Sequence, residues 1–231
     1  MGSLVMHLCI GKKIASKIKP TQKKEFLIGN LAPDLSKITN LAKNISHYLK
    51  KEIKNGVEIE VPDLERFVNE YKERLGEPFI QGYLCHLISD DLWFREYIPN
   101  HVVSITEDKK HILLRDIDDY IPYEEFRKRM YKDYSKTNEY LYELYKVNLK
   151  QFDDMKIQNP KMKEFEYEKI HRLIEQISFY LEFEKNRNTD ELIDGLEKGI
   201  EELDMLSKEE CVTYIEQAVE QVKRKMEELE V

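Results

Sequence analysis

Two side chains able to bind a metal ion stand four residues apart in the stretch from 82 to 94. His86 and Asp90 occupy positions i and i+4 of an otherwise apolar run. In a helix, such positions lie one above the other on the same face. The apolar neighbours on nearly all sides predict a helix buried in the middle of a helical protein. Because burying an unpaired carboxylate is costly, we expect another side chain or a cation to face this pair.

A His and an Asp at this spacing can also hydrogen-bond to each other or to a neighbouring helix, without any metal. The upstream chain favours the metal, because His7, Asp34 and His47 stand there in apolar or turn contexts. Three His and two Asp form a ligand set that one hydrogen-bonded pair does not explain. Such ligands without Cys suit divalent transition metals, with Zn²⁺ the first candidate and Mn²⁺ or Fe²⁺ as alternatives.

Length and composition predict one all-α domain over residues 1–231. Charged residues make up 35% of the chain against 41% hydrophobic, with only 8 Gly and 7 Pro. This balance is typical of long helices with exposed faces rather than of a β-sandwich or a disordered tail. We expect the metal site in the half from about 1 to 150, and helices that serve mainly for packing from about 160 to 231.

Charge and cysteine content indicate which partners and which cellular compartment the protein is suited to. The formal net charge of -8 argues against general nucleic-acid binding or an anionic-membrane surface. Cys9, Cys85 and Cys211 are odd in number, far apart and set in apolar surroundings, which is typical of buried reduced thiols. The first eight residues lack a signal-peptide pattern, and no run is long enough for a transmembrane segment. We therefore expect a cytoplasmic protein, whose oligomeric state the sequence leaves open.

Helices are predicted on both sides of the central run. Residues 3–19 are expected to form a helix with an apolar stripe along one face. Residues 26–34 are expected to form a short helix ended by Gly29 and Pro33. Asp34 would then follow a rigid turn, either pointing inward or capping the residues after it. A helix over about 63–75 precedes the central helix, which starts at Pro78.

The remaining chain is predicted to be helical after one interruption. Residues 99–122 form a small hairpin or a long loop over the site, with His101 and His111 on the surface. Long helices are expected over 123–151, 165–183, 190–206 and 207–229, the last with a capping box at Ser207 and Glu210. The pair His171 and Glu175 is expected to be a surface pair.

The order of these motifs resembles the zinc-dependent phospholipase C family, which shares its fold with the P1 and S1 nucleases. The resemblance covers roughly the first 95 residues: His7, the stretch 26–34 with Asp34, His47, and the helical His86 and Asp90. It implies an all-α bundle that holds metal ions between its helices and hydrolyses a phosphate ester. The substrate would be a small phosphate ester or a phospholipid head group.

The family's metal cluster has further His and Glu ligands, and this chain departs from that part of the pattern. Glu96, Asp133, His171 and Glu175 are the alternatives for completing the site, and the sequence does not decide among them. We therefore expect one or two ions rather than three. A bound metal would lower the pKa of a water molecule toward about 7. Asp34, if it is not a ligand, is the best candidate for the general base.

Two other functions are compatible with the sequence. An HD-type metal phosphohydrolase is also all-α with His and Asp ligands, but that class depends on an adjacent His-Asp dipeptide, which is absent here. A non-catalytic helical binding or scaffold protein would use the same polar residues as a hydrogen-bond network. Metal content separates this last class from the two enzymes.

Overall fold

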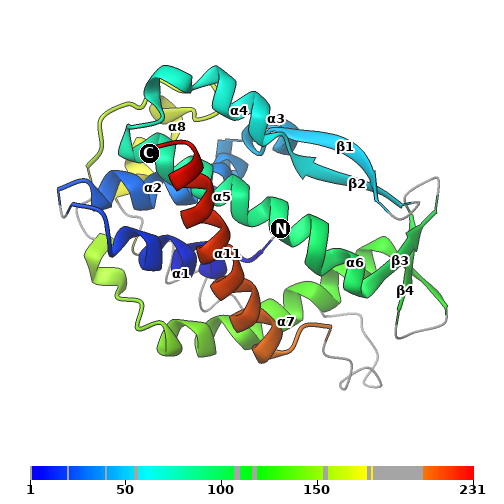
Figure 1. The fold of residues 1–231 in the computed structure, drawn as a ribbon. Coiled ribbons are helices and arrows are strands. Elements are labelled where there is room, and N and C mark those ends of the chain that lie inside the picture. Colours follow the sequence, from blue (N-terminus) through cyan, green and yellow to red (C-terminus); the bar gives the residue numbers. More distant parts are fainter. Residues whose placement is uncertain are drawn as a thin grey trace.

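The chain folds mostly into helices, with two small antiparallel sheets on one side (Figure 1). The computed structural model describes residues 2–19, 21–39, 41–54, 57–106, 110–115, 119–152, 156–175, 178 and 205–231. The expected all-α class is therefore confirmed in its main feature, a mostly helical chain, to which two small sheets are added. The helix expected over 190–206 lies outside the described residues except for its last two positions, 205 and 206, which are not helical.

The helices follow the expected order along the chain. Short 3₁₀ turns at Ser36–Thr39, Lys72–Arg74 and Leu149–Phe152 and a π-helical turn at Trp93–Tyr97 join or extend them. No helix among the described residues is long and apolar enough to cross a membrane. The α-helices are α1 (Leu4–Ala15), α2 (Lys23–Leu35), α3 (Lys43–Ser46), α4 (Leu64–Glu70), α5 (Pro78–Leu92), α6 (Ile98–His101), α7 (Tyr123–Leu144), α8 (Tyr167–Glu175) and α11 (Lys208–Glu228).

The sheets are the part of the fold that the all-α expectation missed. Strands β1 (Leu49–Lys54) and β2 (Val57–Pro62) form a hairpin, and β3 (Val102–Ile105), β4 (His111–Leu114) and β5 (Tyr120–Pro122) form a three-stranded sheet. The first hairpin has a clear signal, because residues on both sides of Asn55-Gly56 alternate between polar and apolar. The second sheet confirms the hairpin alternative for residues 99–122.

Helix α2 corrects the expectation of a turn before Asp34. The helix runs through Gly29 and Pro33 to Leu35, so Asp34 lies within its last turn. Proline lacks a backbone N–H and therefore removes one hydrogen bond, to the carbonyl four residues earlier. Every residue from Phe26 to Leu35 is buried, and this burial outweighs the loss.

Two glycines allow α2 and α5 to lie unusually close together. A Cβ atom on Gly29 would lie 2.1 Å from the carbonyl oxygen of Phe79, and one on Gly82 would lie 2.0 Å from that of Phe26. Neither position accepts a side chain without moving a backbone. This close contact brings the polar residues of α2 level with those of α5.

The long helices at the two ends of the chain close the bundle. Helix α11 begins with the predicted capping box of Ser207 and Glu210 and crosses α1 and α5 (Figure 1). Its buried face belongs to one hydrophobic cluster that extends from Val5 to Met226. His111 is exposed, as expected. His101 was also expected on the surface, but its side chain is only 14% exposed, and its Nε2 lies 3.4 Å from Oε1 of Glu210.

Candidate metal centre

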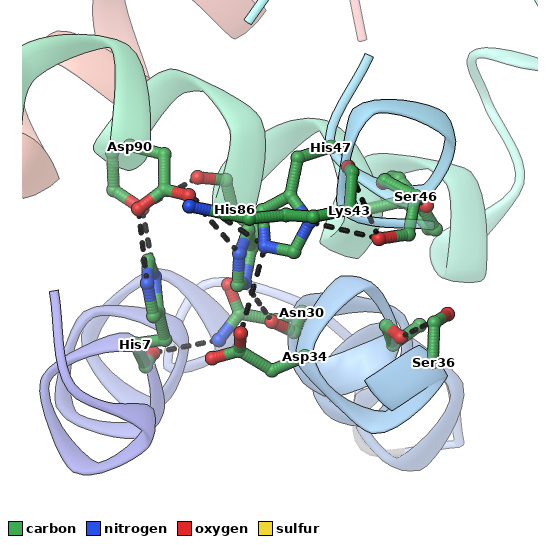
Figure 2. Close-up of polar contacts among 12 residues, drawn as sticks. His7, Asn30, Asp34, Ser36, Lys43, Ser46, His47, His86 and Asp90 are labelled. Atoms are coloured by element: carbon green, nitrogen blue, oxygen red, sulfur yellow. Dashed lines mark hydrogen bonds and ion pairs between the residues drawn. The ribbon is translucent and has the colours of Figure 1, made fainter. Parts of the chain in front are cut away.

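The five predicted ligands come together in the interior of the bundle. His7 lies on α1, Asp34 on α2, His47 directly after α3, and His86 with Asp90 on α5 (Figure 2). Their side chains are between 0% and 4% exposed. Four separate elements therefore supply one buried cluster of three imidazoles and two carboxylates.

Asp90 lies at the centre of this cluster and uses its two oxygens differently. Oδ1 lies 3.3 Å from Nε2 of His7, whereas Oδ2 lies 3.6 Å from Nε2 of His86 and 3.8 Å from Nε2 of His47. Asp34 approaches the same place, with Oδ1 at 3.5 Å from Nε2 of His47. All three imidazoles thus present Nε2 to carboxylate oxygens.

The opposite nitrogen of two imidazoles has a fixed role. Nδ1 of His86 lies 2.9 Å from the carbonyl oxygen of Asn30, which can only accept, so this Nδ1 carries the proton. Nδ1 of His7 lies 3.0 Å from Oγ of Ser89, and Ser89 already donates its own proton to the carbonyl of His86. Ser89 must therefore accept from His7. These contacts select, for each ring, the tautomer with the proton on Nδ1 and the lone pair on Nε2.

The same arrangement recurs at His47. Its Nδ1 lies 2.8 Å from Oγ of Ser46, whose hydroxyl also lies 3.4 Å from the carbonyl oxygen of Lys43. We assign the proton of this imidazole to Nδ1 as well. Anchoring of one nitrogen by a hydroxyl or carbonyl, with the other left bare, is the pattern that orients histidine ligands of metal ions.

The consequence is a group of electron-pair donors with no proton between them. Among the described residues, Nε2 of His7, His47 and His86 and both oxygens of Asp90 have no hydrogen-bond partner. Lone pairs that face one another at these distances repel. Burial would add to the cost, because an unsatisfied polar atom has no water to compensate it. A cation placed between the donors would replace this repulsion with attraction.

Burial disfavours an extra proton on two of the imidazoles. It lowers the pKa of His47 to about 4, and together with the neighbouring His86 it lowers the pKa of His7. Burial also acts to raise the pKa of Asp90, but hydrogen bonds and positive charge from His7 and His86 in their protonated forms outweigh this effect and hold the pKa well below the ordinary value. Near neutral pH the cluster therefore contains at least one ionised carboxylate and bare imidazole nitrogens.

The spacing also fits a metal ion. Ligands about 2.0–2.2 Å from a tetrahedral Zn²⁺ ion lie roughly 3.3–3.6 Å from one another. The contacts between Nε2 and Oδ atoms range from 3.3 to 3.8 Å. The donor atoms of His7, Asp34 and His86 lie within 4.8 Å of one another, and so do those of His47, His86 and Asp90. A nitrogen and oxygen set of this kind suits Zn²⁺, Mn²⁺ or Fe²⁺.

The other candidate ligands have different contacts. Glu96 pairs with Lys54 at 3.1 Å and is 60% exposed, and Asp133 accepts backbone hydrogen bonds from Met205 and Leu206 at 2.6 and 3.1 Å. His171 is partly exposed on α8, where its Nδ1 lies 3.0 Å from the carbonyl oxygen of Glu168. The side chain of Glu175 lies outside the described residues.

Sequence reasoning missed the residues that orient the ligands. Asn30 accepts from His86 through its backbone and donates through Nδ2 to the carbonyl of His7 at 2.6 Å, so it joins α1, α2 and α5. Ser89 and Ser46 contact His7 and His47. The sequence contains one indication of the role of Asn30: it stands four residues before Asp34 and would lie on the same face of a helix. The partner of Ser89 depends on how α1 packs, which no local pattern shows.

Comparisons with models of protein families, with curated proteins and with solved structures found no match.

Proposed function

We propose that this protein is a metal-dependent hydrolase of phosphate esters, a phosphodiesterase that resembles phospholipase C in its chemistry. The observation that carries this proposal is the convergence of three Nε2 lone pairs, from His7, His47 and His86, on the carboxylates of Asp34 and Asp90. The order of these residues along the chain, with the resemblance drawn from it, directs the proposal toward phosphate esters.

The donor atoms fall into two overlapping groups, which supports one or two ions. His7, Asp34 and His86 form one group, and His47, His86 and Asp90 form the other. The rings of His7 and His86 stack at 3.8 Å with an angle of 16° between their planes. Each group would hold one ion, with His86 next to both.

The residues of the chain then have separate tasks. When bound, divalent ions supply positive charge for phosphoryl oxygens and lower the pKa of water toward about 7. Asp90 joins the two halves of the cluster, and Asn30, Ser46 and Ser89 keep the imidazoles in the ligand tautomer. Asp34 lies near enough to His47 to be a ligand. Its role as general base stays a prediction.

A second candidate is a non-catalytic metal-binding protein, and the burial of the cluster favours it. His7, His47, His86 and Asp90 are fully buried, whereas substrate must reach the metal in a hydrolase. Hydrolysis therefore requires an opening, and α3 is a candidate for it, because Lys43 to Ile45 are exposed while His47, two residues later, is buried.

Metal content and turnover together test the proposal. Protein purified without chelator should contain about one or two divalent transition-metal ions per chain, and chelation should lower its melting temperature. The metal-loaded protein should hydrolyse bis-p-nitrophenyl phosphate, and Zn²⁺ or Mn²⁺ should restore this activity after chelation. Metal uptake without hydrolysis would favour the non-catalytic candidate. Less than about 0.2 equivalents of metal even after refilling would overturn both, and hydrolysis of monoesters alone would favour an HD-type phosphohydrolase.

A further inference from the structure

Helix α3 separates the metal centre from solvent on one side of the cluster. Lys43, Asn44 and Ile45 are exposed, whereas Ser46 and His47, which follow at once, are buried. The carbonyl of Lys43 is also tied to the cluster, because it lies 3.4 Å from the Ser46 hydroxyl that contacts His47. Lys43 therefore stands at the outer rim of the centre with its backbone fixed to a proposed ligand.

The side chain of Lys43 reaches across from α3 to the helix that carries Asp90. Its Nζ lies 5.1 Å from the centre of the Phe94 ring, a distance at which an ammonium group is attracted to an aromatic face. Phe94 follows Asp90 by four residues in the same continuous helical run, and it is half-buried. Phe94 stands about one helical turn after Asp90, so the ammonium group lies beside the turn that follows this proposed ligand.

Lys43 also differs from the other lysines nearby. On the adjacent hairpin, Lys50, Lys51 and Lys54 each lie within 3.2 Å of a glutamate oxygen. In the part of the chain that the structure describes, no carboxylate lies within ion-pair distance of Lys43, which contacts Phe94 instead. An ammonium group has three hydrogen-bond donors, and its charge-assisted bonds to phosphate oxygens are stronger than neutral ones.

We propose that Lys43 binds a phosphoryl oxygen of the substrate at the rim of the metal centre. The ring of Phe94 holds the ammonium group in place, and the absence of a carboxylate partner leaves its donors for an anion. This assignment rests on the proposed function, since it supplies the part of the substrate site that the buried ligands do not form. It makes Lys43 a residue that selects for the negatively charged phosphoryl group.

Binding of inorganic phosphate tests the assignment without relying on turnover. Lys43→Met keeps the length and the contact with Phe94 but removes the charge. Lys24→Met is the matched control, because Lys24 is exposed at the start of α2, far along that helix from Asp34. Phosphate binding by Zn²⁺-loaded protein is measured by isothermal titration calorimetry, with metal content measured on the same samples.

We expect Lys43→Met to weaken phosphate binding by about tenfold and Lys24→Met to leave it unchanged, with metal content equal in all three proteins. The assignment is overturned if wild type binds phosphate no more tightly than Lys43→Met, whatever the metal content. The proposed function is tested independently, by metal content and by hydrolysis of the diester. If the diester is hydrolysed, Lys43→Met should raise KM more than it lowers kcat.

Discussion

Nε2 of His7 lies 3.3 Å from Oδ1 of Asp90, with both side chains fully buried, and no hydrogen bond joins them. The proton of His7 is on the other nitrogen, where Ser89 accepts it. The two nearest atoms of this pair are therefore both electron-pair donors. A His–Asp hydrogen bond, which is the alternative to a metal site, would require a second proton on His7, and burial disfavours that proton.

Replacing Asp90 by Asn should remove most of the bound metal. The substitution keeps the size of the side chain but removes the negative charge that faces three imidazoles, and a lost charged ligand costs more than an ordinary hydrogen bond of about 0.5–1.5 kcal/mol. The measurements are metal content and far-ultraviolet circular dichroism, which should stay helical. Asp91→Asn is the control, because Asp91 pairs with Arg95 at 2.8 Å instead. Full metal content in Asp90→Asn would show that the site does not depend on this carboxylate.

Replacing Ser89 by Ala should weaken metal binding by roughly 10–100-fold, because His7 loses the acceptor that fixes its tautomer and its ring. Ser16→Ala is a close control. Both hydroxyls donate to the carbonyl three residues earlier, but Ser16 is exposed and contacts no histidine. Competition with a chromogenic chelator gives both affinities. Equal affinities would leave Ser89 with a purely structural role.

Replacing Gly82 by Ala should destabilise the protein by about 1–3 kcal/mol or more, because the new Cβ atom meets the Phe26 carbonyl at 2.0 Å and forces α2 away from α5. Metal affinity should fall as well, since Asp34 and Asn30 move with α2. Urea denaturation measures the first effect. Gly76→Ala should change little, because nothing lies within 4 Å of its Cβ position. Similar losses in the two variants would contradict the close contact.

The metal-free protein should lose stability as the pH falls from about 6.5 to 4. In the unfolded chain His47 binds a proton near its ordinary pKa of 6.5, whereas burial lowers its pKa in the folded protein to about 4. The unfolded state therefore binds more protons in this window, so acid favours unfolding, by about 3 kcal/mol at pH 4. His47→Gln in the presence of chelator should show a shallower dependence of the unfolding free energy on pH. His111→Gln, at an exposed position, should keep the steep one.

The sequence predicted the residues of the cluster better than it predicted the elements that carry them. His86 and Asp90 follow from helical periodicity alone, because both lie within one long apolar helix. Asp34 was placed correctly in the interior for the wrong reason, since α2 continues through Pro33. Local propensity favours a turn there, and burial of the whole helix between its neighbours overrides it.

Other features depend on contacts that span the chain. The stacking of His7 on His86 and the hydrogen bond from Asn30 to the carbonyl of His7 require α1, α2 and α5 to be docked, and no spacing within one element predicts them. The hairpin at 49–62 is different. Its alternation and its Asn55-Gly56 dipeptide are local sequence signals, and the high charge of the composition drew the expectation toward helices instead.

The close approach of α2 and α5 at Gly29 and Gly82 also sets an order of events during folding. Before these helices dock, α5 alone offers only His86 and Asp90, which is too small a ligand set to retain an ion firmly. Asp34 arrives with α2, His47 follows through the short connection after it, and His7 arrives with α1. If the cluster binds metal as proposed, we expect tight uptake to follow the docking of these helices, and its rate in a refolding experiment would report when the interface between α2 and α5 closes.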